Sequence, residues 1–295
     1  MMSSPYDHSG SNAWQGFCAQ QQRLRLEKYR VWLLGGGVFL ALFMTSAHLS
    51  HFSPGRIAEG LPKVHEYVVK ILPEMGVTTF RDDMAYWFYA FPDWMKLLGE
   101  TLLMAYVATL LGTLGALVLG FVAARNVGPN RWLTALSRRV LEVARTVPDL
   151  VYALIFVFAF GLGPLAGILA IAVHSMGASG KLFSEAIENI DLKPLDGLKA
   201  AGGNWVQGMR FAIFPLVLPS LVSYSLWRFE INVRTATVMG IVGAGGIGQE
   251  LITAIRMLYY EDVSALILLI VITVSLTDML CERIRHGFIG KENLS

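Results

Sequence analysis

Charged residues are scarce in this chain of 295 residues. Asp, Glu, Lys and Arg together make up 16% of it and hydrophobic residues make up 54%, whereas soluble domains carry about 25% charged residues. This excludes a water-soluble enzyme and indicates a helical membrane protein. Lys and Arg number 24 against 22 Asp and Glu, so no charge imbalance points to a nucleic-acid partner. The two cysteines, Cys18 and Cys281, fall in segments expected in the cytoplasm, where thiols stay reduced.

The chain also has little of what catalysis or nucleotide binding requires. Residues 243–248 formally match GxGxxG, but that fingerprint needs a preceding strand in a soluble βαβ unit. Residues 175–182 resemble a phosphate loop, yet Ser175 and Leu182 stand where Gly and Ser or Thr are required. His48 and His51 have no third metal ligand nearby. We therefore expect no catalytic residue, metal site or cofactor in this chain, and any ATP-driven work must come from a partner.

What the sequence does contain is a series of apolar blocks long enough to cross a bilayer, about 17–25 residues when helical. The blocks cover residues 31–47, 101–124, 143–162, 164–176, 211–227 and 263–281. Backbone groups in hydrocarbon must be satisfied internally, so these blocks are expected to be helices. The fold class predicted is an all-α polytopic membrane protein with about six transmembrane helices. The first block ends in small residues, so a cleaved signal peptide is an alternative to the favoured uncleaved helix.

Arginines in the short loops predict the orientation through the positive-inside rule. They cluster between the second and third blocks and after the last block. Both termini are therefore expected in the cytoplasm of a multi-pass inner-membrane protein. The segments expected are a tail at 1–30, a first crossing at 31–47, an external segment at 48–96, a core at 97–284 with a cytoplasmic loop at 181–210, and a tail at 285–295.

The external segment is expected to hold a short helix on the outer surface, because residues 61–72 show helical spacing of apolar side chains. Aromatic residues at 86–89, together with Trp94, suit a belt at the membrane interface. A docking surface for an external partner is the alternative for this aromatic cluster.

The cytoplasmic loop at 181–210 has the pattern of two short helices. Pro194 is expected to break the chain, and Asp196 is expected to start a helix by capping and by the helix dipole. Gly202 ends that helix, because glycine allows a left-handed turn. Such a helix suits docking to another subunit, although an ordinary interhelical loop explains the pattern equally well.

Four ionisable residues lie in apolar surroundings: His174, Arg228, Glu230 and Arg234. Intramembrane charge is costly and is a functional hypothesis by default. Glu230 and Arg234 are four residues apart, so an intrahelical ion pair is available to them. Arg228 lacks a local acidic neighbour and suits an oxyanion, because guanidinium binds oxygens in a fork; snorkelling to the outer interface is the alternative. His174 is either a hydrogen-bonded packing residue or a ligand contact.

The glycines at 243–248 lie between two crossings and have two interpretations. They form a broken or re-entrant helix, where irregular backbone must be buried in protein or line a cavity. Alternatively, they allow close helix packing, and both can hold.

The spacing of Asp196-Gly197-Leu198, Gly202 and Phe214-Pro215 resembles the coupling loop of bacterial ABC-transporter permeases. Residues 223–238, which run into 242–248, closely resemble the permease subunit of phosphonate importers, a family that includes phosphite and hypophosphite permeases. The similarity extends to 161–164 and 181–186 and covers about 94–288.

The resemblance implies the type I, MetI-like permease fold and a homodimer. It implies two copies of a separate ATPase that holds ATP and Mg, and an external phosphonate-binding protein. By the same resemblance, Asp196, Gly197, Leu198, Gly202, Phe214 and Pro215 would couple the chain to that ATPase. Phosphonate, phosphite or hypophosphite import is therefore the function expected. One alternative is an intramembrane enzyme acting on a phosphorus-containing lipid, but the sequence lacks the clustered catalytic groups that such an enzyme needs. The other is a stand-alone anion channel, which would not need the polar loop.

Overall fold

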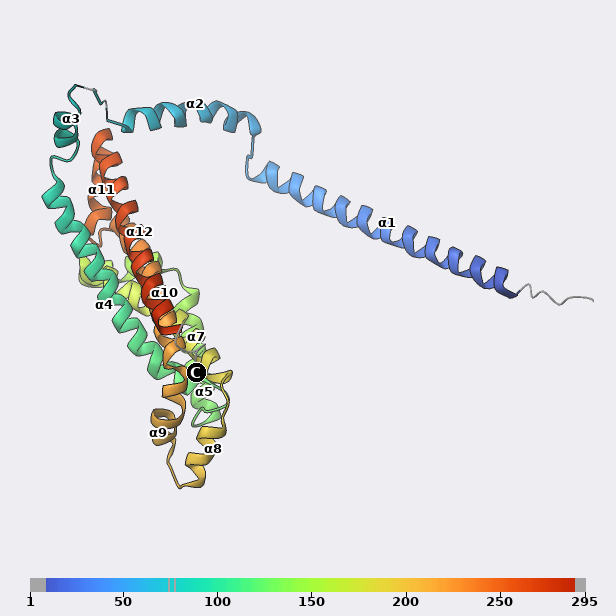
Figure 1. The fold of residues 1–295 in the computed structure, drawn as a ribbon. Helices are drawn as coiled ribbons and strands as arrows, with labels where there is room; N and C mark the ends of the chain where they lie inside the picture. The colour runs from blue at the N-terminus through green and yellow to red at the C-terminus, as the bar shows by residue number, and fades with distance from the viewer. Residues whose placement is uncertain (1–8, 74, 77, 290–295) are drawn as a thin grey trace, which may run out of the picture. The chain divides into compact units, whose positions relative to one another are not determined.

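The computed structural model describes residues 9–73, 75–76 and 78–289. Across this described part the chain forms helices joined by short turns, with no strand. The chain divides into two units, Met1–Tyr67 and Val68–Ser295, and Figure 1 shows the helices of each. The all-α class expected from the sequence is confirmed.

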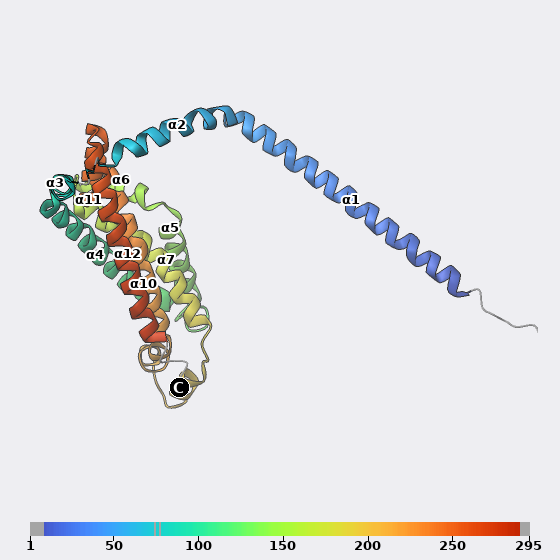
Figure 2. The same ribbon diagram turned by 45° about the horizontal axis from the view of Figure 1, so that its top comes forward.

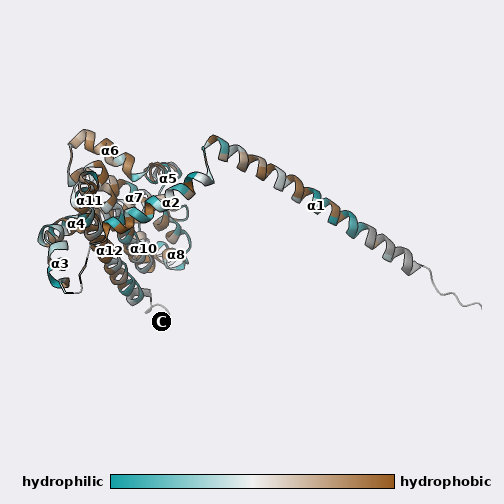
Figure 3. Ribbon diagram, turned by 90° about the horizontal axis from the view of Figure 1, so that it is seen from above, coloured by the Kyte–Doolittle hydropathy of each residue, from teal (hydrophilic) through white to brown (hydrophobic). Residues whose placement is uncertain are grey.

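The first unit consists of α1, Ser9–Leu49, and most of α2, Pro54–Ile71. The apolar part of α1 spans Gln20–Leu49 with no side chain buried by the protein, as a lipid-facing helix requires. The block expected at 31–47 lies inside it. Hydrophilic and hydrophobic residues alternate around α2 (Figure 3). The helix predicted over 61–72 is confirmed and begins earlier than expected.

The second unit is built on four long helices, α4 Phe91–Ala123, α7 Pro164–Glu188, α10 Phe214–Met239 and α12 Tyr260–Ile289. Figure 2 shows them running along one another. The α4–α7 contact is very close, because a Cβ atom added to Gly112 would lie 2.8 Å from Ser175 Cβ. Small residues bring membrane helices together in this way.

The apolar block at 143–162 does not form one continuous helix. The chain there forms two helices, α5 Arg131–Thr146 and α6 Asp149–Phe160, which meet at an angle of 89°. Pro148 explains the break, because proline lacks the N–H that a continuing helix would use and forces the preceding residue into an extended conformation; Val147 accordingly has ψ 126°. Among the described residues, five helices are long and apolar enough to cross a membrane, or six if this bent pair is one span.

The aromatic cluster at 86–89 surrounds the end of α3, Phe80–Trp87. Tyr86 and Tyr89 are exposed, as a membrane-interface belt requires. Trp87 instead packs against α12, where its Nε1 donates to the Glu261 carbonyl and the Ser264 hydroxyl at 3.1 and 3.0 Å. The belt interpretation is wrong for Trp94, which is buried in a core cluster with Leu98 and Leu266.

The glycine run forms a genuine break between two helices. After α10, a 3₁₀ turn at Gly240–Val242 leads to α11, Gly246–Met257, and Gly243, Gly245 and Gly246 all have positive φ. The run also packs closely, because a Cβ atom on Gly248 would overlap the Thr237 carbonyl oxygen. Both sequence interpretations therefore hold. No strand precedes the run within the described chain, so it does not have the setting of a dinucleotide-binding fingerprint.

Candidate substrate pathway and coupling surface

Arg228 lies in the middle of α10 and is 9% exposed. Its Nε donates a hydrogen bond of 3.1 Å to Ser175 Oγ on α7. Ser175 Oγ in turn donates to Asn232 Oδ1 at 2.9 Å, and Asn232 Nδ2 donates to Thr109 Oγ1 on α4 at 2.8 Å. Every member of this chain has a partner, so the network fixes one end of the guanidinium without neutralising its charge.

The two terminal nitrogens of Arg228 make no hydrogen bond or salt bridge within the described residues, since the bond to Ser175 uses Nε alone. The snorkelling alternative is therefore wrong, because the guanidinium is held between helices. The sequence gives Arg228 no acidic neighbour at helical spacing on α10, and the carboxylate of Asp149, at the start of α6, interacts with it electrostatically from another helix. The bend at Pro148 brings Asp149 there, which helical spacing along α10 cannot reveal.

The intrahelical ion pair expected between Glu230 and Arg234 is not formed. Glu230 instead lies 3.4 Å from Arg285, and Arg234 lies 2.6 Å from Asp278. Both partners are on α12, on the opposite side of α10 from Arg228. These contacts between helices replace the local pair, because α12 places an opposite charge beside each of the two residues. They give Glu230 and Arg234 a role in holding α10 against α12.

His174 lies beside Ser175 on α7, and its Nδ1 is 3.1 Å from the carbonyl oxygen of Val147. The tautomer with a proton on Nδ1 donates this bond. It satisfies a backbone carbonyl at the bend between α5 and α6, where helical bonding is interrupted. The contact fits the packing interpretation of His174.

The short helix expected within the polar loop at 181–210 is α8, Lys193–Ala200. The predicted start at Asp196 is wrong, because Pro194 lies in the first turn of the helix and does not break it. Proline suits that position, where its missing N–H has no helical partner. Asp196 still lies near the N-terminus of α8, and the predicted ending is confirmed by Gly202, with φ +85°.

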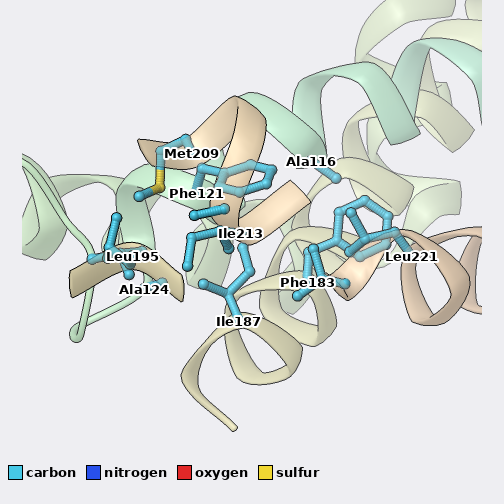
Figure 4. Packing of buried hydrophobic residues seen from close by; sticks show 12 residues of the cluster. Ala116, Phe121, Ala124, Phe183, Ile187, Leu195, Met209, Ile213 and Leu221 are labelled. Carbon is cyan, nitrogen blue, oxygen red and sulfur yellow. The ribbon is translucent and has the colours of Figure 1, made fainter. Parts of the chain in front are cut away.

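One face of α8 is buried and the other is exposed. Leu195 is 3% exposed and belongs to a cluster with Met209 and Ile213, which Figure 4 shows from close by. Leu198 is half-buried. Asp196, Gly197 and Lys199 are exposed. A helix anchored by one leucine and exposed on its far side has the shape of a docking element.

Several contacts brace the chain around α8. Trp205, at the start of α9 (Trp205–Gln207), donates from Nε1 to the Val127 carbonyl oxygen at 2.6 Å. Asn126 Nδ2 donates to the Ile187 carbonyl oxygen at 2.9 Å. The loop after α4, the end of α7 and the segment after α8 are thus tied together.

Phe214 and Pro215 begin α10 directly after a π-helical turn, Gly208–Ile213. The N–H of Phe214 donates to the Met209 carbonyl, five residues back. The turn therefore ends just before proline removes the next donor. The apolar span Trp205–Val242 runs through this turn and continues into α10, which carries Arg228.

Among the described residues, no three His, Cys, Asp or Glu side chains come together as a metal site. The polar network around Arg228 consists of Ser175, Asn232 and Thr109 and holds no base positioned against a nucleophile. Its hydroxyl and amide groups are all engaged in holding one guanidinium.

Residues 116–286 match the family model described as "Binding-protein-dependent transport system inner membrane component". This range includes α8, the π-helical turn, Arg228 and the ion pairs with α12. The resemblance to transporter permeases noted from the sequence is therefore confirmed.

Curated relatives cover between 41% and 84% of the chain. A putative phosphite transport system permease protein, HtxC, from Stutzerimonas stutzeri is 36% identical over 84% of this chain and 84% of its own length. The phosphite transport system permease protein PtxC of the same organism is 40% identical, over 68% of this chain and 73% of its own. The putative cryptic phosphonate transport system permease protein PhnE2 of Escherichia coli K12 is 48% identical over 41% of this chain and all of its own length.

Solved transporters share the fold. An inward-facing structure of the MetNI methionine ABC transporter covers 66% of this chain and 95% of its own, with a TM-score of 0.58 and 22% identity. An amino acid ABC transporter crystallised with histidines covers 68% of this chain and 98% of its own, with a TM-score of 0.55 and 16% identity. The expected MetI-like architecture is confirmed by these matches.

Proposed function

Because this chain belongs to the binding-protein-dependent transport system inner membrane components, we propose that it imports phosphonate, phosphite or a similar small phosphorus oxyanion. The chain is a multi-pass inner-membrane permease of an ABC importer and is not itself an enzyme, since the ATPase of such systems is a separate subunit. What remains to be argued is the substrate class, the route and the coupling.

The observation that carries the substrate class is the state of Arg228. Its Nε is bonded to a neutral hydroxyl, and its two terminal nitrogens remain without a described partner. Guanidinium and phosphorus-bound oxygens pair through two parallel hydrogen bonds. An anion that leaves water needs such fixed donors, because dehydration costs more than one hydrogen bond returns. The relatives' assignments to phosphite and phosphonate transport agree with this chemistry.

Arg228 must release the anion as well as receive it. Conduction requires binding weak enough for departure, and the nearby carboxylate of Asp149 lowers the net positive potential at the guanidinium. The two residues together give a site that attracts an oxyanion without retaining it. The substrate enters from an external phosphonate-binding protein, and a second copy of this chain supplies the other wall of the route.

The experiment for the substrate class uses the chain purified with its ATPase and reconstituted in liposomes with its binding protein outside. ATP-driven uptake is measured for phosphite, methylphosphonate, phosphate and, as an unrelated solute, glycine betaine. The proposal expects uptake of at least one of the first two and none of glycine betaine. Uptake without ATP would favour a channel, and chemical conversion of a phospholipid by the isolated chain would favour the enzyme.

ATPase docking on α8 is the second part of the proposal. Gly197 offers a sharper test than Gly202, because a Cβ atom at Gly197 meets nothing within 4 Å, whereas Gly202 has a positive φ that strains any other residue. Gly197 is exposed and has open space at its Cβ position, so Gly197→Trp should project its ring away from the chain and obstruct a partner. Gly60→Trp in α2, also with open space around its Cβ atom, is the matched control. Loss of ATPase co-purification in the first variant alone supports docking; an unchanged complex contradicts it.

Orientation is a further prediction, with both termini in the cytoplasm. A membrane-impermeant thiol reagent should reach Lys70→Cys in intact cells. Cys281 is 2% exposed, so its failure to react would carry no information. Arg283→Cys, at an exposed position of α12, replaces it as the cytoplasmic reporter. Labelling of that variant from outside would show that the orientation is the opposite of the predicted one.

A further inference from the structure

A second polar site lies where the loop after α4 joins α5. A pocket of about 490 Å³ opens there, and we refer to it as the basic pocket. Its lining residues are Arg125, Gly128, Arg131, Thr134, Ala135, Arg138, Arg139 and Glu142. It includes no residue of α8 and none of the network around Arg228, so it belongs neither to the proposed ATPase dock nor to the proposed route.

Two of the four arginines in the basic pocket are already paired. Arg138 forms a salt bridge with Glu188 at the end of α7, and Arg139 lies 2.5 Å from Glu142. The side chains of Arg125 and Arg131 have no ion pair or hydrogen bond to any residue that the structure describes. Four arginines against Glu142 and Glu188 leave a formal charge of +2. The pocket therefore has two uncommitted guanidinium groups facing one cavity.

The backbone that carries these two arginines is fixed by hydrogen bonds. The N–H of Arg125 donates to Glu188 Oε1 at 2.8 Å, the same carboxylate that binds Arg138. Arg131 is the first residue of α5, directly after Asn130, whose side chain accepts from the N–H of Trp132 at 3.1 Å. Both uncommitted arginines thus extend from fixed points of the backbone, as a preorganised anion site requires.

An apolar surface borders the basic pocket. The residues of α5 that line the pocket recur at helical spacing on one face, and the adjacent face bears Trp132, Leu136 and Val143. These three side chains are 84%, 61% and 62% exposed. Trp at such a boundary is typical of a membrane interface. One helix therefore presents a site for an anion beside a site for hydrocarbon.

We propose that the basic pocket binds the phosphate headgroup of an anionic phospholipid, with its acyl chains against Trp132 and Leu136. The arginines supply bidentate donors to the phosphate oxygens, and basic pockets at the cytoplasmic side of membrane helices bind anionic headgroups in this way. A soluble phosphate would use the guanidinium groups but would leave the apolar face of α5 unused. The continuity of the two surfaces favours the lipid.

The test uses the purified transporter complex in detergent and follows quenching of tryptophan fluorescence by brominated lipids. Brominated phosphatidylglycerol is compared with brominated phosphatidylcholine, and Trp132→Phe identifies the part of the quenching that comes from position 132. We expect quenching of Trp132 at lower concentrations of phosphatidylglycerol than of phosphatidylcholine. Added salt should reduce that preference, because the interaction is partly electrostatic. Equal quenching by both lipids overturns the proposal.

Charge variants locate the site. Arg125→Gln with Arg131→Gln removes only side chains without described partners, so the salt bridges of Arg138 and Arg139 remain. We expect this variant to bind phosphatidylglycerol on the order of tenfold more weakly. Arg256→Gln with Arg283→Gln removes the same charge at exposed positions elsewhere and should bind like the unmodified complex. If both double variants bind phosphatidylglycerol equally weakly, the effect of charge is non-specific, and the assignment of the lipid to the basic pocket is overturned.

Inorganic phosphate and methylphosphonate separate the two possible sources of the anion. Millimolar amounts of either should leave Trp132 quenching by phosphatidylglycerol unchanged beyond the effect of an equal ionic strength of chloride. Displacement of the lipid by phosphate or methylphosphonate, but not by chloride, would overturn the headgroup assignment in favour of a soluble anion. This outcome is independent of the transport assays, so either proposal can fail without the other.

Discussion

The two sides of α10 handle buried charge in opposite ways. Towards α4 and α7, Arg228 is held by the neutral groups of Ser175 and Asn232. Towards α12, Glu230 and Arg234 meet ionised partners, Arg285 and Asp278. The first side keeps a guanidinium charge available, and the second side removes charge by pairing.

This difference separates function from assembly within one helix. A residue paired with an opposite charge has few interactions left for a transported ion, and its loss is felt mainly as lost helix contact. A cation fixed through neutral dipoles keeps most of its field for a ligand. The variants below should therefore divide into two groups, one affecting uptake and one affecting stability.

Arg228→Ala should have the largest effect and abolish uptake, because it removes the free donors of the route. Arg228→Lys should retain part of the uptake, since lysine keeps the positive charge but lacks the paired donors of the guanidinium group. The measurement is uptake in proteoliposomes, normalised to the amount of assembled complex. Basal ATP hydrolysis should persist in both variants. Near-normal uptake with alanine, or failure of the complex to assemble, would assign Arg228 a structural role.

Asn232→Leu should have the next largest effect. It removes the amide between Ser175 and Thr109, so the serine hydroxyl loses the acceptor that orients it towards Arg228. A hydrogen bond to a charged group contributes about 1.5–3 kcal/mol, so uptake should fall on the order of tenfold. Asn232→Gln, which keeps an amide, should be impaired less. Leucine and glutamine variants with equal uptake would show that the network does not orient Arg228.

Glu230→Gln should affect stability more than transport. It leaves Arg285 without its partner, at a cost of about 1–3 kcal/mol for a partly buried charge. The measurement is the thermal unfolding temperature of the purified complex, together with uptake per assembled complex. The unfolding temperature should fall, and uptake per assembled complex should stay close to that of the unmodified protein. A loss of uptake without a loss of stability would erase the proposed difference between the two sides of α10.

The Arg234–Asp278 pair should give the smallest effect, because its side chains are 52% and 37% exposed. Arg234→Ala should lower the unfolding temperature less than Glu230→Gln does, because the Arg234–Asp278 pair is less buried than the Glu230–Arg285 pair. Arg234→Asp should be worse than alanine, and adding Asp278→Arg should restore most of the loss. Thermal unfolding of the two single variants and the double variant measures this. Additive losses in the double variant would show that the pair does not interact.

The sequence predicted correctly the features that depend only on residues close together along the chain. The apolar blocks predicted the long helices, and Gly202 predicted the end of α8, because hydropathy and left-handed φ are local properties. The bend at Pro148 was missed, since a proline inside an apolar block does not show whether a helix kinks or stops. The true start of α8 was missed because Pro194 suits a first turn as well as it suits a break.

The candidate site depended more on contacts between distant segments. Arg228 was identified from its charge in an apolar setting, but Ser175 and Asp149 interact with it from other helices, and nothing in their local sequence shows that. Glu230 and Arg234 were assigned to each other by their spacing, whereas α12 supplies both partners. The spacing of Arg228 and Asn232, one helical turn apart, was the one signal that could have indicated the network.

The most direct test of the account is to observe the transported anion inside the permease. The assembled transporter, trapped with its binding protein and a hydrolysis-deficient ATPase in the presence of ATP and phosphite, is imaged by electron cryomicroscopy. We predict density for the anion within hydrogen-bonding distance of the terminal nitrogens of Arg228, with its Nε still bonded to Ser175. Anion density along a route that does not contact Arg228 would contradict the account.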